Sequence, residues 1–228
     1  MTTDALRSIT ENLWVAERPL PLIVGDIGAR MTVIRLPSGG LWLHSPIRLD
    51  EPTRAALDAL GPVEAVVAPS LAHHLFAGGY PKVYPDAGLY GAPGLDRKRE
   101  NLRFTAMLGD EAPAAWQGTI DQLVFGGAPL LNEVVFFHRP SATLILTDLA
   151  FNVPADGTKG ARVFHWLVGS KGKFGPHRII RTAIRDRAAA REQVGRMLAW
   201  DFDRVIVSHG EVLETGGHAA LERAFAFL

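Results

Sequence analysis

The feature that most constrains this chain is a repeated pattern in which a short apolar run is followed by a histidine or an aspartate. The runs and the residues after them are 63–67 with His73 and His74, 134–137 with His138, 143–146 with Asp148, and 205–207 with His209. Apolar runs of this length, bounded by turn residues, are typical of buried strands. Residues beyond the carboxyl ends of parallel strands line one crevice in an open α/β sheet. If these strands are parallel neighbours, the pattern predicts that the five side chains converge on one rim.

Such a cluster has the chemistry of a metal site. Adjacent histidines need partners for their polar ring nitrogens, and a metal ion is one partner that satisfies such rings. Imidazole nitrogens with a carboxylate suit Zn²⁺, Fe or Mn²⁺. Each residue also has an ordinary interpretation: a helix N-terminus for His73 and His74, a turn or cap for Asp148, a turn for His209, and a polar turn for His138.

The remaining sequence predicts a layered α/β protein. Pro-Ser-Gly-Gly between two apolar runs indicates a β-hairpin over 31–46, and Asp50 before Glu-Pro-Thr indicates a capped helix. Other expected elements are an edge strand within 13–24, strands at 63–67, 88–91, 122–125, 134–137, 143–146 and 204–207, and helices after His74, over 181–200 and over 218–227. The early hairpin requires a mixed sheet, since a purely parallel sheet has no hairpins.

Two stretches are less regular. Residues 152–176 are rich in glycine, lysine and proline and predict a long loop with a helix near 163–168, whereas 95–118 gives no firm element. No internal repeat, low-complexity tract or domain linker is evident, so we expect one domain over residues 1–228.

The composition limits the classes of function. Lysine plus arginine and aspartate plus glutamate each number 24, so the net charge of zero gives no general argument for a nucleic-acid or membrane partner. Cysteine is absent, which excludes disulfides, thiolate ligands and cysteine nucleophiles. No signal peptide is recognisable, and no apolar run approaches the ~20 residues of a membrane span. We therefore expect a cytoplasmic protein that acts on a small molecule.

A basic segment over 171–196 has two interpretations. It contains eight lysines and arginines but only two acidic residues, Asp186 and Glu192. It could form a basic wall for an anionic substrate or an RNA phosphate. The favoured interpretation is a solvated helix face with an i,i+4 pair between Glu192 and Arg196.

The order of these motifs resembles the metallo-β-lactamase fold over most of the chain. In that family a strand leads into His-x-His-x-Asp-His, followed by a histidine, an aspartate and a final histidine after later strands. The matching positions are Pro69, Leu71, His73 and His74, then His138, Asp148 and His209, with His44 where an early aspartate would stand. The whole-chain pattern is similar to a subgroup described as the domain of unknown function DUF4336. The resemblance implies an αββα four-layer sandwich with two mixed β-sheets.

The departures from the family pattern imply one metal site rather than two. The first site loses two of its three ligands because Pro69 and Leu71 cannot bind a metal. The residues matching the second site are His73, His74, Asp148 and His209, which imply a mononuclear centre. His138 would remain as a loose ligand or proton-transfer group, and Asp148 would also be catalytic.

Three functions are consistent with this centre. The first is hydrolysis of a small ester, lactone, amide or phosphate with one divalent metal, zinc before iron or manganese. The second is a degenerate, non-catalytic protein that holds no metal and binds a ligand or partner in the old cleft. The third is an iron-dependent oxidoreductase.

Overall fold

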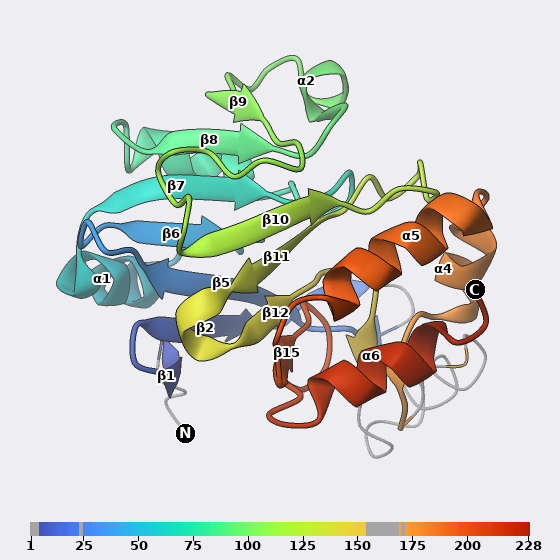
Figure 1. The fold of residues 1–228 in the computed structure, drawn as a ribbon. Helices are drawn as coiled ribbons and strands as arrows, with labels where there is room; N and C mark the ends of the chain where they lie inside the picture. Colours follow the sequence, from blue (N-terminus) through green and yellow to red (C-terminus); the bar gives the residue numbers. More distant parts are fainter. Residues whose placement is uncertain (1–4, 23–24, 154–168, 170–171) are drawn as a thin grey trace.

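Two β-sheets and the helices around them form the fold. The computed structural model describes residues 5–22, 25–153, 169 and 172–228. Both large sheets contain parallel and antiparallel pairs, so both are mixed. Figure 1 shows them stacked against each other, with α5 and α6 over the smaller sheet and α1 beside the larger one. The αββα sandwich predicted from the sequence is confirmed.

The larger sheet holds the amino-terminal half of the chain. Its order is β1 (Arg7–Thr10), β2 (Leu13–Arg18), β5 (Ala29–Arg35), β6 (Leu41–His44), β7 (Val63–Ala68), β8 (Gly88–Gly91) and β9 (Ala106–Met107). The hairpin expected around Pro-Ser-Gly-Gly is present as the antiparallel pair β5–β6. The expected edge strand is β2, but it lies inside the sheet, between β1 and β5. Pro19 and Pro21 do not interrupt this pairing, because they follow the end of β2 at Arg18.

The smaller sheet holds the carboxyl-terminal half. Its order is β10 (Ile120–Val124), β11 (Val134–His138), β12 (Thr143–Ile145) and β15 (Arg204–Ile206). Strand β11 is antiparallel to β12, whereas β12 and β15 are parallel. Successive side chains of β11 alternate between the two faces: Val134 and Phe136 pack in the core between the sheets, while Val135 and Phe137 pack in the core beneath the helices.

The helices and short strand pairs complete the chain. The helices in the described residues are α1 (Glu51–Leu60), α2 (Leu95–Lys98), α4 (Arg178–Ala183), α5 (Arg187–Leu198) and α6 (Gly217–Phe225), with 3₁₀ turns η1 (Ala77–Lys82) and η2 (Arg139–Ser141). Two short pairs join β3 (Pro21–Leu22) with β4 (Gly25–Asp26) and β13 (Phe151–Asn152) with β14 (Phe174–Gly175). Among the residues described, no helix is both long and apolar enough to cross a membrane.

Some predicted elements differ from the structure. The helix expected over 181–200 is two helices, because Asp186 caps α5 through the backbone N–H groups of Ala188 and Ala189. The helix expected after His74 is the 3₁₀ turn η1, and 95–118 contains the short elements α2 and β9. The helix expected near 163–168 lies outside the described residues.

Several arginines of the basic segment have partners within the fold. Arg196 pairs with Asp110 from the loop before β10 rather than with Glu192. Arg181 stacks on the Phe227 ring at 3.9 Å. Through these contacts, Arg181 attaches α4 and Arg196 attaches α5 to the rest of the fold.

Asp50 is a cap that the sequence predicted correctly. Its Oδ1 accepts the backbone N–H of Thr53 at 2.9 Å, and Arg18 Nε donates to its Oδ2 at 2.9 Å. The hydrogen bond from Arg18 holds the pKa of Asp50 well below its usual range. The residue therefore fixes the start of α1 and also ties α1 to β2.

We expect Asp50→Ala to lower the free energy of unfolding by about 1–2 kcal/mol at pH 7, because it removes the cap acceptor and the Arg18 partner. Asp50→Asn keeps the acceptor and should lose less. Since the folded-state pKa is lowered, the contribution is present above about pH 4 and should diminish as the pH falls below that value. Urea denaturation at several pH values measures both effects. Equal losses in the two variants would contradict the capping role.

Candidate metal centre

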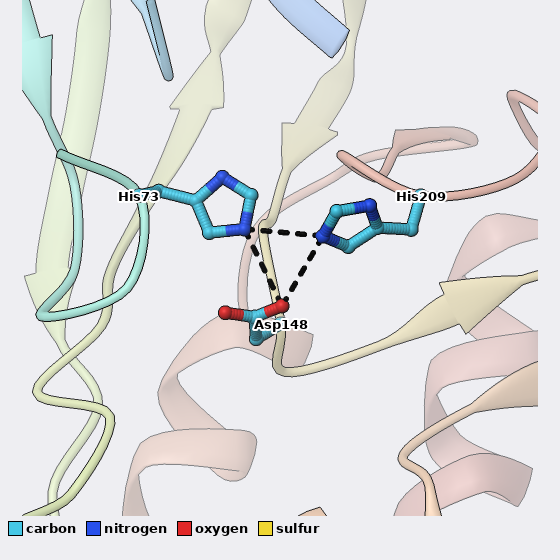
Figure 2. Close-up of side chains that lie close together, drawn as sticks. All are labelled: His73, Asp148 and His209. Atoms are coloured by element: carbon cyan, nitrogen blue, oxygen red, sulfur yellow. Dashed lines mark hydrogen bonds and ion pairs between the residues drawn. The ribbon is translucent and has the colours of Figure 1, made fainter. Parts of the chain in front are cut away.

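Three of the predicted residues meet at one rim of the sandwich. The parallel pairing of β12 with β15 places Asp148 and His209 just beyond the same ends of neighbouring strands. His73 comes from the loop after β7 in the larger sheet. Figure 2 shows the three side chains pointing toward one another. His73 Nε2 lies 3.3 Å from Asp148 Oδ1 and 3.3 Å from His209 Nε2, and His209 Nε2 lies 3.4 Å from Asp148 Oδ1.

The outer nitrogen of each ring is held by a neighbouring group. His209 Nδ1 donates to the Gly28 carbonyl at 2.7 Å, and His73 Nδ1 lies 2.8 Å from Ser45 Oγ. A carbonyl oxygen only accepts, so Nδ1 of His209 carries a proton, and Nε2 is the ring nitrogen that faces the other two side chains. Metal-binding histidines typically have such a partner on the nitrogen that does not bind the metal.

The charge of Asp148 complements the two imidazoles. Burial by itself would raise the pKa of Asp148, but His73 and His209 together hold it well below its usual range. The carboxylate is therefore ionised at neutral pH. These three residues are the group able to offer one ligand atom each to a common ion in the part of the chain that the structure describes.

Glu133 positions Asp148 and was not predicted from the sequence. Its fully buried carboxylate lies before β11 and accepts backbone N–H groups of Thr147 at 2.6 Å, Asp148 at 2.9 Å and Leu149 at 2.9 Å. Burial and the nearby Asp148 charge raise the pKa of Glu133 to about 7. One side chain thus fixes three successive backbone donors in the turn that carries Asp148.

His74 does not join the group, although the sequence predicted it as a ligand. Arg99 Nη1 donates to His74 Nδ1 at 2.8 Å, so the ring is held beside the end of α2. Burial and the charges of Lys98 and Arg99 lower the pKa of His74. Neighbouring residues in the loop direct their rings to different partners, and only His73 meets Asp148 and His209.

His138 lies at the other end of the smaller sheet, so the predicted convergence is wrong for this residue. It pairs with Thr143 at the start of β12, whereas Asp148 follows the end of that strand. Its Nδ1 lies 2.7 Å from Ser141 Oγ, and burial lowers its pKa to about 4. The sequence does contain a signal for this arrangement. Only the four residues 139–142 connect the two strands, and such a short connection joins antiparallel strands rather than parallel ones. Glu133, at the opposite end of β11, faces the site instead.

His44 lies in the core rather than in the site. It is buried, stacks on Trp42 with ring centroids 5.5 Å apart, and meets the Phe136 ring edge-on at 5.3 Å. Burial and the neighbouring His73 lower its pKa to about 3. The ring therefore packs as a neutral core residue.

A pocket of about 230 Å³ opens beside the three residues. Its polar lining comes from Ser45, His73, His74, Asp148 and His209. The apolar walls are formed by Leu20, Ile27, Ala29, Pro46, Ile47, Ala72, Leu75 and Phe76. A group with two imidazoles, one carboxylate and an adjacent pocket is the arrangement of a metal site with room for a small ligand.

Comparisons with solved structures agree with this fold. A metallo-β-lactamase from Pontibacter korlensis superposes with a TM-score of 0.66 at 14% identity, covering 98% of this chain and 99% of that one. Another from Erythrobacter litoralis gives 0.64 at 18% identity, covering 97% and 94%. FIM-1 from Pseudomonas aeruginosa, solved in its mono-zinc form, gives 0.63 at 15% identity, covering 97% and 94%. The chain therefore has the metallo-β-lactamase fold.

Within that fold, the chain belongs to the family described as the domain of unknown function DUF4336. The family's sequence profile matches residues 10–166, which include His73 and Asp148. No curated protein matches the sequence.

The hydrogen bonds of Glu133 give a stability prediction. Glu133→Gln replaces one acceptor oxygen by an amide NH₂ that faces a backbone donor. We expect the free energy of unfolding to fall by about 1–3 kcal/mol, because at least one buried N–H loses its acceptor. Urea denaturation measures this loss. Glu64→Gln is the control, because its carboxylate accepts from the exposed Ser38 hydroxyl and its loss should change stability by less than about 0.5 kcal/mol. Equal effects of the two variants would refute the role of Glu133.

Proposed function

We propose that this protein is a mononuclear metal-dependent hydrolase whose ion is held by His73, Asp148 and His209. The separation of the three ligand atoms is the observation that carries the proposal. A tetrahedral zinc ion with bonds of about 2.0–2.1 Å places neighbouring ligand atoms about 3.3–3.4 Å apart. The three measured separations of 3.3, 3.3 and 3.4 Å match those edges.

The donor set supports zinc as the ion. Two imidazoles and a carboxylate, with a fourth position toward a pocket, form a known type of catalytic zinc site. The same donor set also occurs in non-haem iron oxygenases, which supports the oxidoreductase as the second candidate. An octahedral ion with bonds of about 2.1 Å would bring adjacent ligand atoms to about 3.0 Å, which is shorter than the observed separations. The geometry therefore favours a four-coordinate ion.

When bound, such an ion lowers the pKa of a water molecule toward neutrality and polarises a carbonyl or phosphoryl oxygen. The chain's own residues supply the rest. Gly28 and Ser45 keep the two imidazoles oriented, and Glu133 fixes the turn that carries Asp148. Asp148 would offer Oδ1 to the ion. The apolar walls hold the non-reacting part of a small ester, lactone, amide or phosphate and exclude water from it.

Metal content tests the ligand assignment. We expect about one zinc ion per chain after purification with zinc, and loss of the ion in His73→Ala, Asp148→Asn and His209→Ala. His74→Ala and His138→Ala are matched controls that should retain it, because both rings are held away from the group. Elemental analysis measures the stoichiometry. A wild-type protein that stays metal-free after zinc, manganese and iron supplementation would refute the proposal, as would full retention in His209→Ala.

Cobalt substitution tests the coordination number. Cobalt(II) in a four-coordinate site absorbs visible light much more strongly than in a six-coordinate site. We therefore expect an intense visible band from the cobalt-loaded protein, and its disappearance in His73→Ala. A weak spectrum, together with tight iron binding, would instead support the oxidoreductase.

A further inference from the structure

A buried arginine in the first half of the chain holds the loop that carries His209. Arg30 lies on β5 of the larger sheet, and its side chain is 6% exposed. Its Nη1 donates to the carbonyl of Val207, and its Nη2 donates to the carbonyl of Gly210 at 2.5 Å. These two carbonyls flank His209 in the sequence. The guanidinium therefore fixes the backbone on both sides of a proposed metal ligand.

The guanidinium is held in place from behind by Glu17. Arg30 Nε donates to Glu17 Oε1 at 2.8 Å, and Nη2 makes a second hydrogen bond to the same oxygen. Although burial opposes ionisation of Glu17, the hydrogen bond and charge of Arg30 lower its pKa, so the partner stays anionic. Strands β2 and β5 place the two residues directly opposite each other. The ion pair with Glu17 thus orients the Arg30 guanidinium toward the two loop carbonyls.

The same strand also orients the His209 ring. Gly28, two residues before Arg30, offers the carbonyl that accepts from His209 Nδ1. The ring and the backbone of His209 are therefore both fixed by the start of β5. This contact joins the larger sheet to the loop that follows the last strand of the smaller sheet.

The opposite side of the loop is closed by Asn152. Its backbone N–H donates to the His209 carbonyl at 3.3 Å, and its own carbonyl accepts from Glu211 at 2.7 Å. Gly210 has a φ of +92°, and a Cβ there would lie 2.2 Å from the Asn152 oxygen. The loop is thus held tightly between Asn152 and Arg30, and its conformation depends on both contacts.

We propose that Arg30 is a positioning residue that sets the affinity of the metal centre by fixing His209. The inference rests on the proposed metal-binding function. Arg30 also borders an open cavity of about 750 Å³, but four hydrogen bonds already occupy its guanidinium. Since arginine has five N–H donors, little capacity remains for an anionic ligand. Positioning therefore fits its contacts better than ligand binding.

The experiment compares Arg30→Met with Arg35→Met. Arg35 lies on the same strand and donates to the Leu60 carbonyl at 2.9 Å, but it is five residues, or about 17 Å, further along β5. Zinc affinity is measured by competition with a chromophoric chelator, and hydrogen exchange is followed in a peptide covering 205–213. We expect Arg30→Met to weaken zinc binding by about 10–100-fold and to speed exchange in this peptide. Arg35→Met should leave both unchanged, even if it lowers the melting temperature.

A conservative variant separates charge from geometry. Arg30→Lys keeps the charge but cannot reach both carbonyls as a planar fork, so we expect an intermediate zinc affinity. Unchanged zinc affinity in Arg30→Met, or an equal loss in Arg35→Met, would overturn the inference while leaving the metal site intact. A wild-type protein that binds no metal would instead refute the proposed function. In that case the exchange measurement decides about Arg30 separately: unchanged exchange in Arg30→Met would overturn its role.

Discussion

The parallel pairing of β12 with β15 is the constraint on which the site depends. Because the two strands run in the same direction, Asp148 and His209 leave the smaller sheet at the same rim. If the strands were antiparallel, the same residues would lie at opposite ends, as happens to His138 on β11. Stacking the larger sheet against this one then brings the loop after β7, with His73, over the same rim. The parallel direction of β12 and β15 and the packing of the larger sheet against the smaller one thus bring the three side chains together.

The three side chains are held by a second set of contacts that come from distant parts of the chain. Glu133 fixes the backbone of the Asp148 turn, Gly28 and Arg30 fix His209, and Ser45 meets His73. Each contact is a partly buried hydrogen bond, and its loss would leave a donor or acceptor without its partner in the fold. Such outer contacts orient the ligand atoms of metal sites, and their loss typically lowers metal affinity by about 10–100-fold.

The adjacent residues His73 and His74 have different partners in the folded protein. Both rings follow the same strand, yet His73 turns toward the rim while His74 accepts a hydrogen bond from Arg99. An isolated pair in the sequence contains no information about this choice, because it depends on the position of α2. The proposed metal site has three candidate ligands, His73, Asp148 and His209, and a pocket beside them. This arrangement leaves room for water and a substrate, in keeping with the proposed hydrolase.

The sequence by itself determined most of the strands, the hairpin at 31–46, the Asp50 cap and the fold resemblance, because these depend on local periodicity, turn chemistry and motif order. It also predicted His73, Asp148 and His209 as members of one cluster. Only the tertiary structure excluded His74 and His138 from that cluster and revealed Glu133 and Arg30. Ring direction, strand direction and hydrogen bonds between residues far apart in the chain arise from packing, so they have no local signature in the sequence.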